Sequence, residues 1–314
     1  MSATHSTTAP QPPNNDPAAP ARRPDRWRNV LLWTLAVLMM LVSVVYQRRT
    51  GPTYPKRGSV TVAGQEYDYR LIRSEYTHID AHVVLPDLGD AAAVTLFYKR
   101  YKTDDPWSSK PMERETVDGK TQLYGELPTQ PAAGKVEYYL QVDAGGQTQR
   151  IPEGQENVVI RFKDHVPTVI LASHVLLMFF AVLIGMRAGL GAIVGDWRMR
   201  TLSWVTFIGM SLGGMVLGPI VQKYAFGEYW TGFPWGYDLT DNKMLIMWIV
   251  WLIACTTIGL RPKKNEKVGR AVVVVAMLVM TVVYLIPHSM RGSELDYSKL
   301  DQGVHPKDAI GTGD

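Results

Sequence analysis

Cysteine is almost absent from this chain of 314 residues, and the one present, Cys255, lies inside a long apolar run. A single cysteine excludes a disulfide within the chain, a CxxC motif and a zinc site made from several cysteines. We interpret Cys255 as a small buried hydrophobic residue. The net charge is only +4, and Lys and Arg flank apolar runs instead of gathering with stacking aromatics. Nucleic acid is therefore not an expected partner.

Charge is nearly absent from five long stretches of the sequence. They are Val30–Tyr46, Val169–Met186, Leu202–Val221, Met244–Leu260 and Ala271–Pro287. Each is long enough, or nearly so, to cross the hydrocarbon core of a bilayer, which takes about 20 residues in a helix. The sequence therefore predicts an integral membrane protein, with the lipid bilayer as a partner of its apolar surface.

The segment before the first apolar run has basic residues, but no small-x-small cleavage site precedes "YQRR". We therefore predict a retained transmembrane helix at 29–47. The tail before it, 1–28, is rich in Pro, Ala, Thr and Asn, a composition typical of disorder. The other expected boundaries are a polar region at 51–165, a four-helix transmembrane bundle at 167–288 (helices 169–186, 202–221, 244–260 and 271–287) and a tail at 289–314.

The charges of the short loops predict the orientation. Loop 261–270 has five basic residues and one acidic, and loop 187–200 has three basic residues. Loop 222–243 has only two basic residues and is rich in Trp and Tyr. Loops rich in Lys and Arg remain on the cytoplasmic side. This predicts a bacterial inner-membrane protein with its N-terminus in the cytoplasm. Region 51–165, loop 222–243 (the aromatic loop) and the C-terminus are predicted to lie outside.

The polar region 51–165 has the pattern of β-strands. Short β-branched or aromatic runs such as "AAVTLFYKRY" and "KVEYYLQVD" alternate with turn signals such as "DDP", "DGK" and "PAAGK". The stretch from "AVTLFYKRY" to "QVDAGGQ" resembles the fibronectin type III or immunoglobulin-like modules of bacterial exported proteins, with Tyr138 and Tyr139 as their paired tyrosines. The predicted fold class is an α-helical membrane bundle of five transmembrane helices, with an extracytoplasmic all-β immunoglobulin-like sandwich inserted between helices 1 and 2.

Residues 226–248, "FGEYWTGFPWGYDLTDNKMLIMW", place aromatic and acidic residues where the chain enters an apolar run. Trp and Tyr gather at bilayer interfaces because their rings are apolar while their N–H and O–H groups favour water. Asp238 is also suited to the N-cap of the following helix, where a carboxylate matches the positive end of the helix dipole. One interpretation is thus an interfacial anchor, although the loop is longer than two helices need in order to turn.

Histidines near the predicted outer face favour a second interpretation. His174 lies in the first two turns of the second run, His288 follows the fifth, and His165 is a nearby substitute for His174. A histidine inside a membrane usually has a partner or a function, because its burial there is costly. Two neutral imidazoles beside flat aromatic rings suit haem, whose iron takes axial histidine ligands. We predict a haem b site with His174 and His288 on the iron, and with Trp230 and Trp235 as walls.

The residues "FGEYW" followed by "WGYDLTDNKMLIMW" resemble the tryptophan-rich segment of the cytochrome c assembly proteins that handle haem. Asp238, Asp241 and Trp248 occupy matching places, whereas Tyr237 stands where that family has Trp and Leu239 where it has Pro. The family also places one external histidine two spans before this segment and another two spans after it. The resemblance implies that haem is handled at the outer membrane face and that Asp238 belongs to the cofactor site.

Two classes of function remain open from the sequence. One is an accessory or assembly protein that binds haem, and the other is a structural or interaction scaffold without a cofactor. The polar region has no Ser-His-Asp set, paired-acid motif or Gly-rich phosphate loop, so an enzyme is not favoured. We predict an inner-membrane accessory or assembly protein that presents its β domain to a membrane or periplasmic protein partner.

Overall fold

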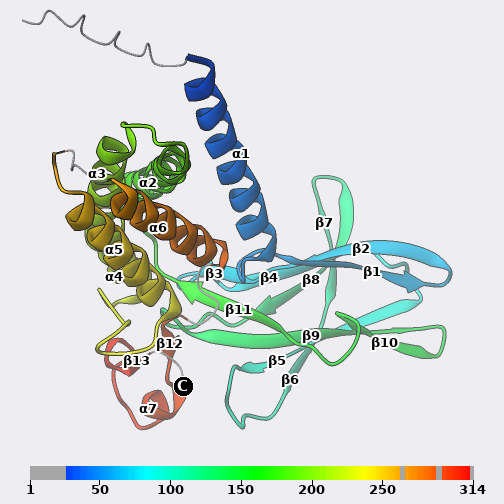
Figure 1. Ribbon diagram of the computed structural model, residues 1–314. Helices are drawn as coiled ribbons and strands as arrows, with labels where there is room; N and C mark the ends of the chain where they lie inside the picture. Colours follow the sequence, from blue (N-terminus) through cyan, green and yellow to red (C-terminus); the bar gives the residue numbers. More distant parts are fainter. Residues whose placement is uncertain (1–25, 262–265, 288–291, 312–314) are drawn as a thin grey trace, which may run out of the picture.

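The computed structural model describes residues 26–261, 266–287 and 292–311. The chain starts with one long helix, α1 (Arg26–Thr50), continues through a β-rich region, and then forms a mainly helical part (Figure 1). Figure 1 shows the β-rich region projecting sideways from one end of the helices, with the short C-terminal elements at that same end.

The predicted fold class is wrong in its arrangement. We expected an immunoglobulin-like sandwich inserted between helices 1 and 2 of a five-helix bundle. The order is instead one helix, a β-rich region at 56–163, and then a helical C-terminal part. Much of α1 is exposed, and it buries only a narrow stripe of residues: Leu32, Ala36, Met40 and Ser43. An apolar run predicts that a helix can cross a bilayer, but it does not predict which neighbours that helix packs against.

The β-rich region contains several separate sheets. A hairpin is made by β1 (Lys56–Val62) and β2 (Gln65–Leu71), and a three-stranded sheet has the order β4 (Ala81–Pro86), β8 (Lys120–Leu127), β7 (Glu113–Val117). The largest sheet has the order β3 (Ser74–Tyr76), β11 (Val158–Lys163), β9 (Lys135–Ala144), β5 (Ala92–Arg100), β6 (Ser108–Pro111), with β10 (Gln147–Ile151) also on β9. Strand β3 runs parallel to β11, whereas β9 is antiparallel to both β5 and β11.

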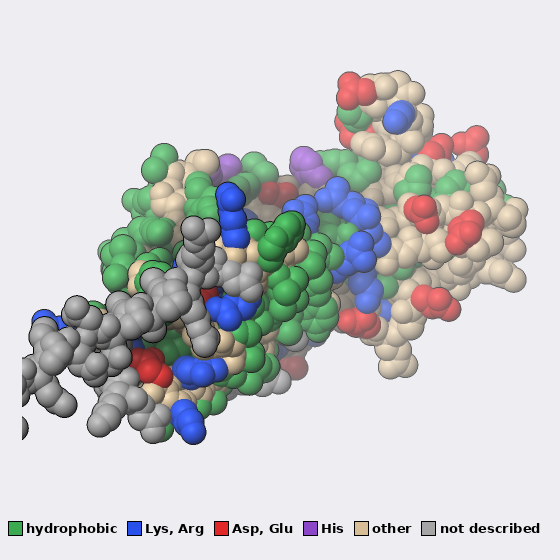
Figure 2. Space-filling view, turned by 45° about the horizontal axis from the view of Figure 1, so that its top comes forward, with side chains coloured by type: hydrophobic (Ala, Val, Ile, Leu, Met, Phe, Trp, Pro, Cys, Tyr) green, Lys and Arg blue, Asp and Glu red, His purple; other side chains and the backbone are tan. Residues whose placement is uncertain are grey.

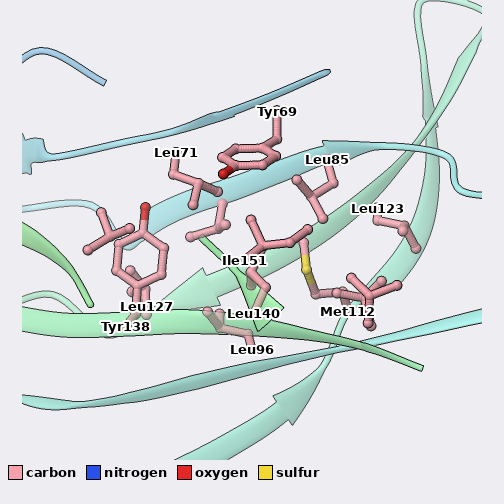
Figure 3. Packing of buried hydrophobic residues seen from close by; sticks show 14 of the residues in the cluster. Tyr69, Leu71, Leu85, Leu96, Met112, Leu123, Leu127, Tyr138, Leu140 and Ile151 are labelled. Carbon is pink, nitrogen blue, oxygen red and sulfur yellow. The ribbon is translucent and has the colours of Figure 1, made fainter. Parts of the chain in front are cut away.

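Alternating side chains from these strands form the core of the β-rich region. Figure 3 shows Tyr69 and Leu71 of β2 facing Leu96 of β5 and Leu140 of β9 across this core. Tyr138 is fully buried beside them, and its hydroxyl donates to the backbone carbonyl of Ile72 at 2.8 Å, so this buried hydroxyl is paired. This packing fixes β9 and its neighbour β11, the strand that ends beside the helices.

The helical part consists of α2 (Thr168–Val194), α3 (Met199–Met210), a π-helical turn η1 (Ser211–Leu217), α4 (Gly218–Phe226), α5 (Leu239–Ile258) and α6 (Lys267–Leu285). Within the described residues, five helical segments are long and apolar enough to cross a membrane, namely α1, α2, the continuous stretch from α3 to α4, α5 and α6. Hydrophobic side chains cover much of the helical side of the molecule in Figure 2, but far less of the β-rich region. These features are compatible with a membrane protein.

The two ends of the helical part have different neighbours. At one end, the backbone amide of Asp164, just after β11, donates to the carbonyl of Ala225 near the end of α4 (2.9 Å). At the other end, arginine side chains bind backbone carbonyls of adjacent helices: Arg200 binds Gly259 (2.9 Å) and Arg270 binds Ala192 (2.6 Å). Arg200 and Arg270, which belong to the two basic loops, therefore lie at the end opposite the β-rich region.

The last described segment consists of β12 (Glu294–Leu295), α7 (Tyr297–Asp301), a 3-10 turn η2 (Pro306–Ala309) and β13 (Ile310–Gly311). The Tyr297 hydroxyl is buried and accepts a hydrogen bond from the backbone amide of Lys135 (3.0 Å). Glu294 forms ion pairs with the Lys135 and Lys102 side chains, and Asp301 pairs with Arg100 (2.7 Å). These contacts attach the C-terminal segment to β5 and β9.

Glycine allows α2 and α6 to approach closely. A Cβ atom added at Gly189 would lie 2.4 Å from the Cβ of Met277, so the two helices would have to separate. We expect Gly189→Ala to lower the unfolding free energy by about 1–3 kcal/mol, although alanine favours a helix more than glycine does. Met277→Gly removes the clashing atom, so the loss in the double variant Gly189→Ala/Met277→Gly should be smaller than the sum of the two single losses. Thermal unfolding in detergent measures both, and an unchanged melting temperature for Gly189→Ala would contradict this packing.

Candidate functional site

A pocket of about 390 Å³ lies among the helices at the end nearest β11. Its apolar lining includes Leu171 and Met178 of α2 and Met244 and Met247 of α5. Its other end is polar and is lined by Arg161, Gln222, Asp238, Asp241 and Lys243. The volume falls near the lower end of the range for small-molecule sites, about 300–1,000 Å³. An apolar wall beside a charged end suits an amphipathic ligand.

His174, one of the two predicted iron ligands, lines this pocket and is half-buried. Its Nδ1 atom lies 2.8 Å from the carbonyl oxygen of Gly213. A carbonyl only accepts, so Nδ1 carries the proton and Nε2 of the neutral ring is an acceptor. Among the described residues Nε2 has no hydrogen-bond partner. This is how a metal-binding histidine is usually held, with its second nitrogen fixed by a carbonyl.

The carbonyl that holds His174 belongs to the π-helical turn η1. Here the backbone amide of Gly218 donates to the Gly213 carbonyl, five residues back, instead of to the residue four back. Single π-helical turns inside α-helices often occur at functional sites. Glycine at position 213 also allows η1 to approach α2, because a Cβ atom there would lie 2.9 Å from the Cβ of Leu177. The turn thus brings its carbonyl close to α2, where His174 lies.

The other predicted cofactor residues have different positions. Trp230 lines the pocket and is half-buried, whereas Trp235 is 81% exposed and does not line it. His165 is also exposed and lies against the ring of Tyr76, 6.0 Å between centroids, so it is not a substitute for His174 in this pocket. His288, the second predicted iron ligand, lies outside the described residues.

Asp238 lines the pocket, and its carboxylate connects three segments. Its Oδ1 atom accepts from the backbone amide of Thr240 (2.7 Å), so Asp238 is the N-cap of α5, as its position in the sequence indicated. Its Oδ2 atom accepts from the Ser293 amide (2.8 Å) and the Thr231 hydroxyl (3.0 Å). Asp238 thereby joins the start of α5, the aromatic loop and the C-terminal segment.

Asp241 is the second carboxylate at the polar end. It accepts from the backbone amide of Thr231 (2.7 Å) and from the Gln222 side chain (3.2 Å). Both carboxylates are almost fully buried, with 3% of Asp238 and 6% of Asp241 exposed. Neutral N–H and O–H donors therefore surround the negative charges of the site.

Two buried cations lie at the same end. Arg161 of β11 stacks on the ring of Phe226, with its guanidinium carbon 3.9 Å from the ring centroid, and donates to the Ser293 carbonyl. Burial lowers the pKa of Arg161 to about 10, although the charges of Asp238 and Glu294 act to raise it, so it remains protonated at neutral pH.

Lys243 is the second cation, and only 3% of it is exposed. Its ammonium group donates to the backbone carbonyls of Ile286 and Pro287. It therefore ties the first turn of α5 to the end of α6 as well as lining the pocket.

Arg161 and Met178 are pocket residues that our reasoning from the sequence missed. An arginine inside the apolar strand "NVVIRF" is unusual, and this was the available signal for Arg161. Nothing in the sequence singled out Met178 from its apolar neighbours. No protein-family model matches this chain, and no curated protein matches it either.

Proposed function

We propose that this chain is an integral membrane accessory or assembly protein that binds haem in the pocket beside β11. The observation that supports it most is His174, whose Nδ1 is held by the Gly213 carbonyl while Nε2 is left as an acceptor in a largely apolar pocket. The basic loops favour placement of the β-rich region outside a bacterial inner membrane. We also propose that a membrane or periplasmic protein contacts the β-rich region.

The residues of the pocket fit haem in three respects. His174 would offer Nε2 as a ligand to the iron, Trp230 and Met244 would offer apolar surface, and Arg161 would offer a donor for a propionate. The proposal assigns the aromatic wall to Trp230, which lines the pocket, and not to Trp235, which is 81% exposed. Bound haem would supply one-electron redox chemistry or would be cargo for a partner protein.

A structural scaffold without a cofactor is the second candidate. It is favoured by the hydrogen bonds of Asp238 and Asp241, which connect parts of the fold to one another. The exposed rings of Phe233, Trp235 and Tyr237 suit an anchor at the bilayer interface. Haem titration separates the two candidates, because the scaffold requires no ligand at His174.

The test is an absorption titration of the purified protein in detergent with ferric haem. We expect a Soret band that saturates at one haem per chain in the wild type and in the matched control His165→Ala, whose histidine is exposed and outside the pocket. His174→Ala should weaken haem binding by at least about tenfold, because an axial ligand is lost. A folded wild type that gives no saturable band, or an unchanged His174→Ala variant, would overturn this proposal.

A further inference from the structure

Arg161 and Lys243 are both buried and line the same end of the pocket, yet neither forms an ion pair with any described residue. A buried charge without a counter-charge is costly, and such charges are normally paired. The partners that these two cations have are backbone carbonyls, which carry only partial charge. The pocket therefore contains two positive charges that have no directly bonded counter-anion among the described residues, although the charge of Asp238 acts on both through space.

Both cations also retain donors. The Nε atom of Arg161 is buried and has no hydrogen-bond partner among the described residues. The Lys243 ammonium group has three N–H donors, and two of them are accounted for by the carbonyls of Ile286 and Pro287. An unpaired buried donor is costly, so an acceptor supplied by a ligand would be favoured here.

The carboxylates of the site form no direct ion pair with these two cations among the described residues. Asp238 and Asp241 are surrounded by neutral donors, and Asp238 also lies at the positive end of the α5 dipole. Gly292 lies against both Asp238 and Arg161, since a Cβ atom added to it would be 3.4 Å from Asp238 Oδ2 and 3.2 Å from Arg161 NH1. Neutral donors thus take up the hydrogen bonds of both carboxylates, and the remaining N–H donors of Arg161 and Lys243 are available to a ligand.

We infer that the pocket recognises an amphipathic ligand through its carboxylate, which binds Arg161 and Lys243 while the apolar part of the ligand lies along Met178, Met244 and Met247. This inference rests on the proposal that the pocket is the ligand site, but it does not require His174 to bind iron. The same chemistry is offered by a haem propionate and by the head of a fatty acid.

The experiment compares each acid with its neutral ester, which keeps the apolar part and removes the charge. The probes are ferric haem against its dimethyl ester, followed by absorption, and oleate against methyl oleate, followed by displacement of a fluorescent fatty acid. We expect at least one acid to bind the wild type about tenfold or more tightly than its ester, as charge-assisted hydrogen bonds contribute about twice what neutral ones do. Which acid shows the preference identifies the source of the carboxylate.

Arg161→Gln should weaken this preference several-fold, because only Lys243 is then left to bind the carboxylate, whereas Arg70→Gln, which replaces an exposed arginine on β2, should preserve it. Equal affinity of acid and ester in the wild type overturns the inference, and this comparison requires no variant to fold. A full preference in Arg161→Gln also overturns it.

If no haem band forms but oleate still binds better than methyl oleate, the haem proposal fails and this inference stands. If haem binds through His174 but neither acid binds better than its ester, the haem proposal stands and this inference fails.

Discussion

Asp196→Ala is expected to lower the unfolding free energy by about 3–5 kcal/mol, because it leaves a buried arginine without its counter-charge. Arg187 of α2 is fully buried, and its NH2 group donates to Asp196 Oδ2 (2.7 Å) and to Asn29 Oδ1 of α1 (2.9 Å). Its Nε and NH1 atoms are buried and have no hydrogen-bond partner among the described residues. The single carboxylate of Asp196 is therefore essential to keep this charge in place.

A double-mutant cycle measures that interaction. Arg187→Met removes the buried charge and keeps an apolar side chain of similar length, so Asp196→Ala/Arg187→Met should be more stable than Asp196→Ala alone. Chemical or thermal unfolding in detergent gives the unfolding free energies of the wild type, the two single variants and the double variant. Additive losses from the two single changes would contradict a direct pair between Arg187 and Asp196.

The same pair predicts a pH dependence. Burial acts to raise the pKa of Asp196, but the hydrogen bond from Arg187 and the backbone amide of Arg198 lower it overall. A carboxyl whose folded pKa lies below its unfolded value, about 3.9, contributes stability above that value and loses it as the pH falls through the folded pKa. The acid-induced loss of stability should accordingly be smaller in Asp196→Ala/Arg187→Met than in the wild type.

Asp238→Ala is expected to lower the unfolding free energy by about 2–4 kcal/mol. The loss combines the N-cap of α5, about 0.5–2 kcal/mol, with an unpaired buried amide at Ser293, about 1–3 kcal/mol. Because Asp238 joins α5 to the C-terminal segment, amide hydrogen exchange in residues 292–311 should also become faster. Thermal unfolding and exchange measured by mass spectrometry check the two effects.

Asp238→Asn is the matched control for this prediction. Asparagine is as good an N-cap as aspartate, so the bond to the Thr240 amide should survive, while the charge is removed. We expect a smaller loss of stability than in Asp238→Ala. Equal stability of Asp238→Ala and the wild type would show that this carboxylate does not hold the aromatic loop and the C-terminal segment together.

The apolar segments and the cap at Asp238 could be predicted from the sequence because each depends on local composition or spacing. Absence of charge over about 20 residues determines which helices can enter a bilayer. Placement of an acidic residue just before such a run determines the cap. Neither inference requires knowledge of distant neighbours.

The arrangement and most of the pocket could not be predicted, because they depend on contacts between distant segments. Arg161 reaches the pocket only because β11 ends beside α4, and Ser293 reaches Asp238 only because the C-terminal segment is attached to β5 and β9. The sequence could not distinguish Trp230, which lines the pocket, from the exposed Trp235 in the same loop. The partly exposed position of α1 likewise depends on packing and not on its hydrophobicity.

The proposal that this pocket binds haem is tested most directly by the absorption spectrum of the wild-type protein purified from haem-replete cells, recorded oxidised and then reduced with dithionite. We expect a Soret band that shifts and sharpens on reduction, as for an iron porphyrin with an imidazole ligand. A well-folded but colourless protein would contradict haem binding and would favour the scaffold.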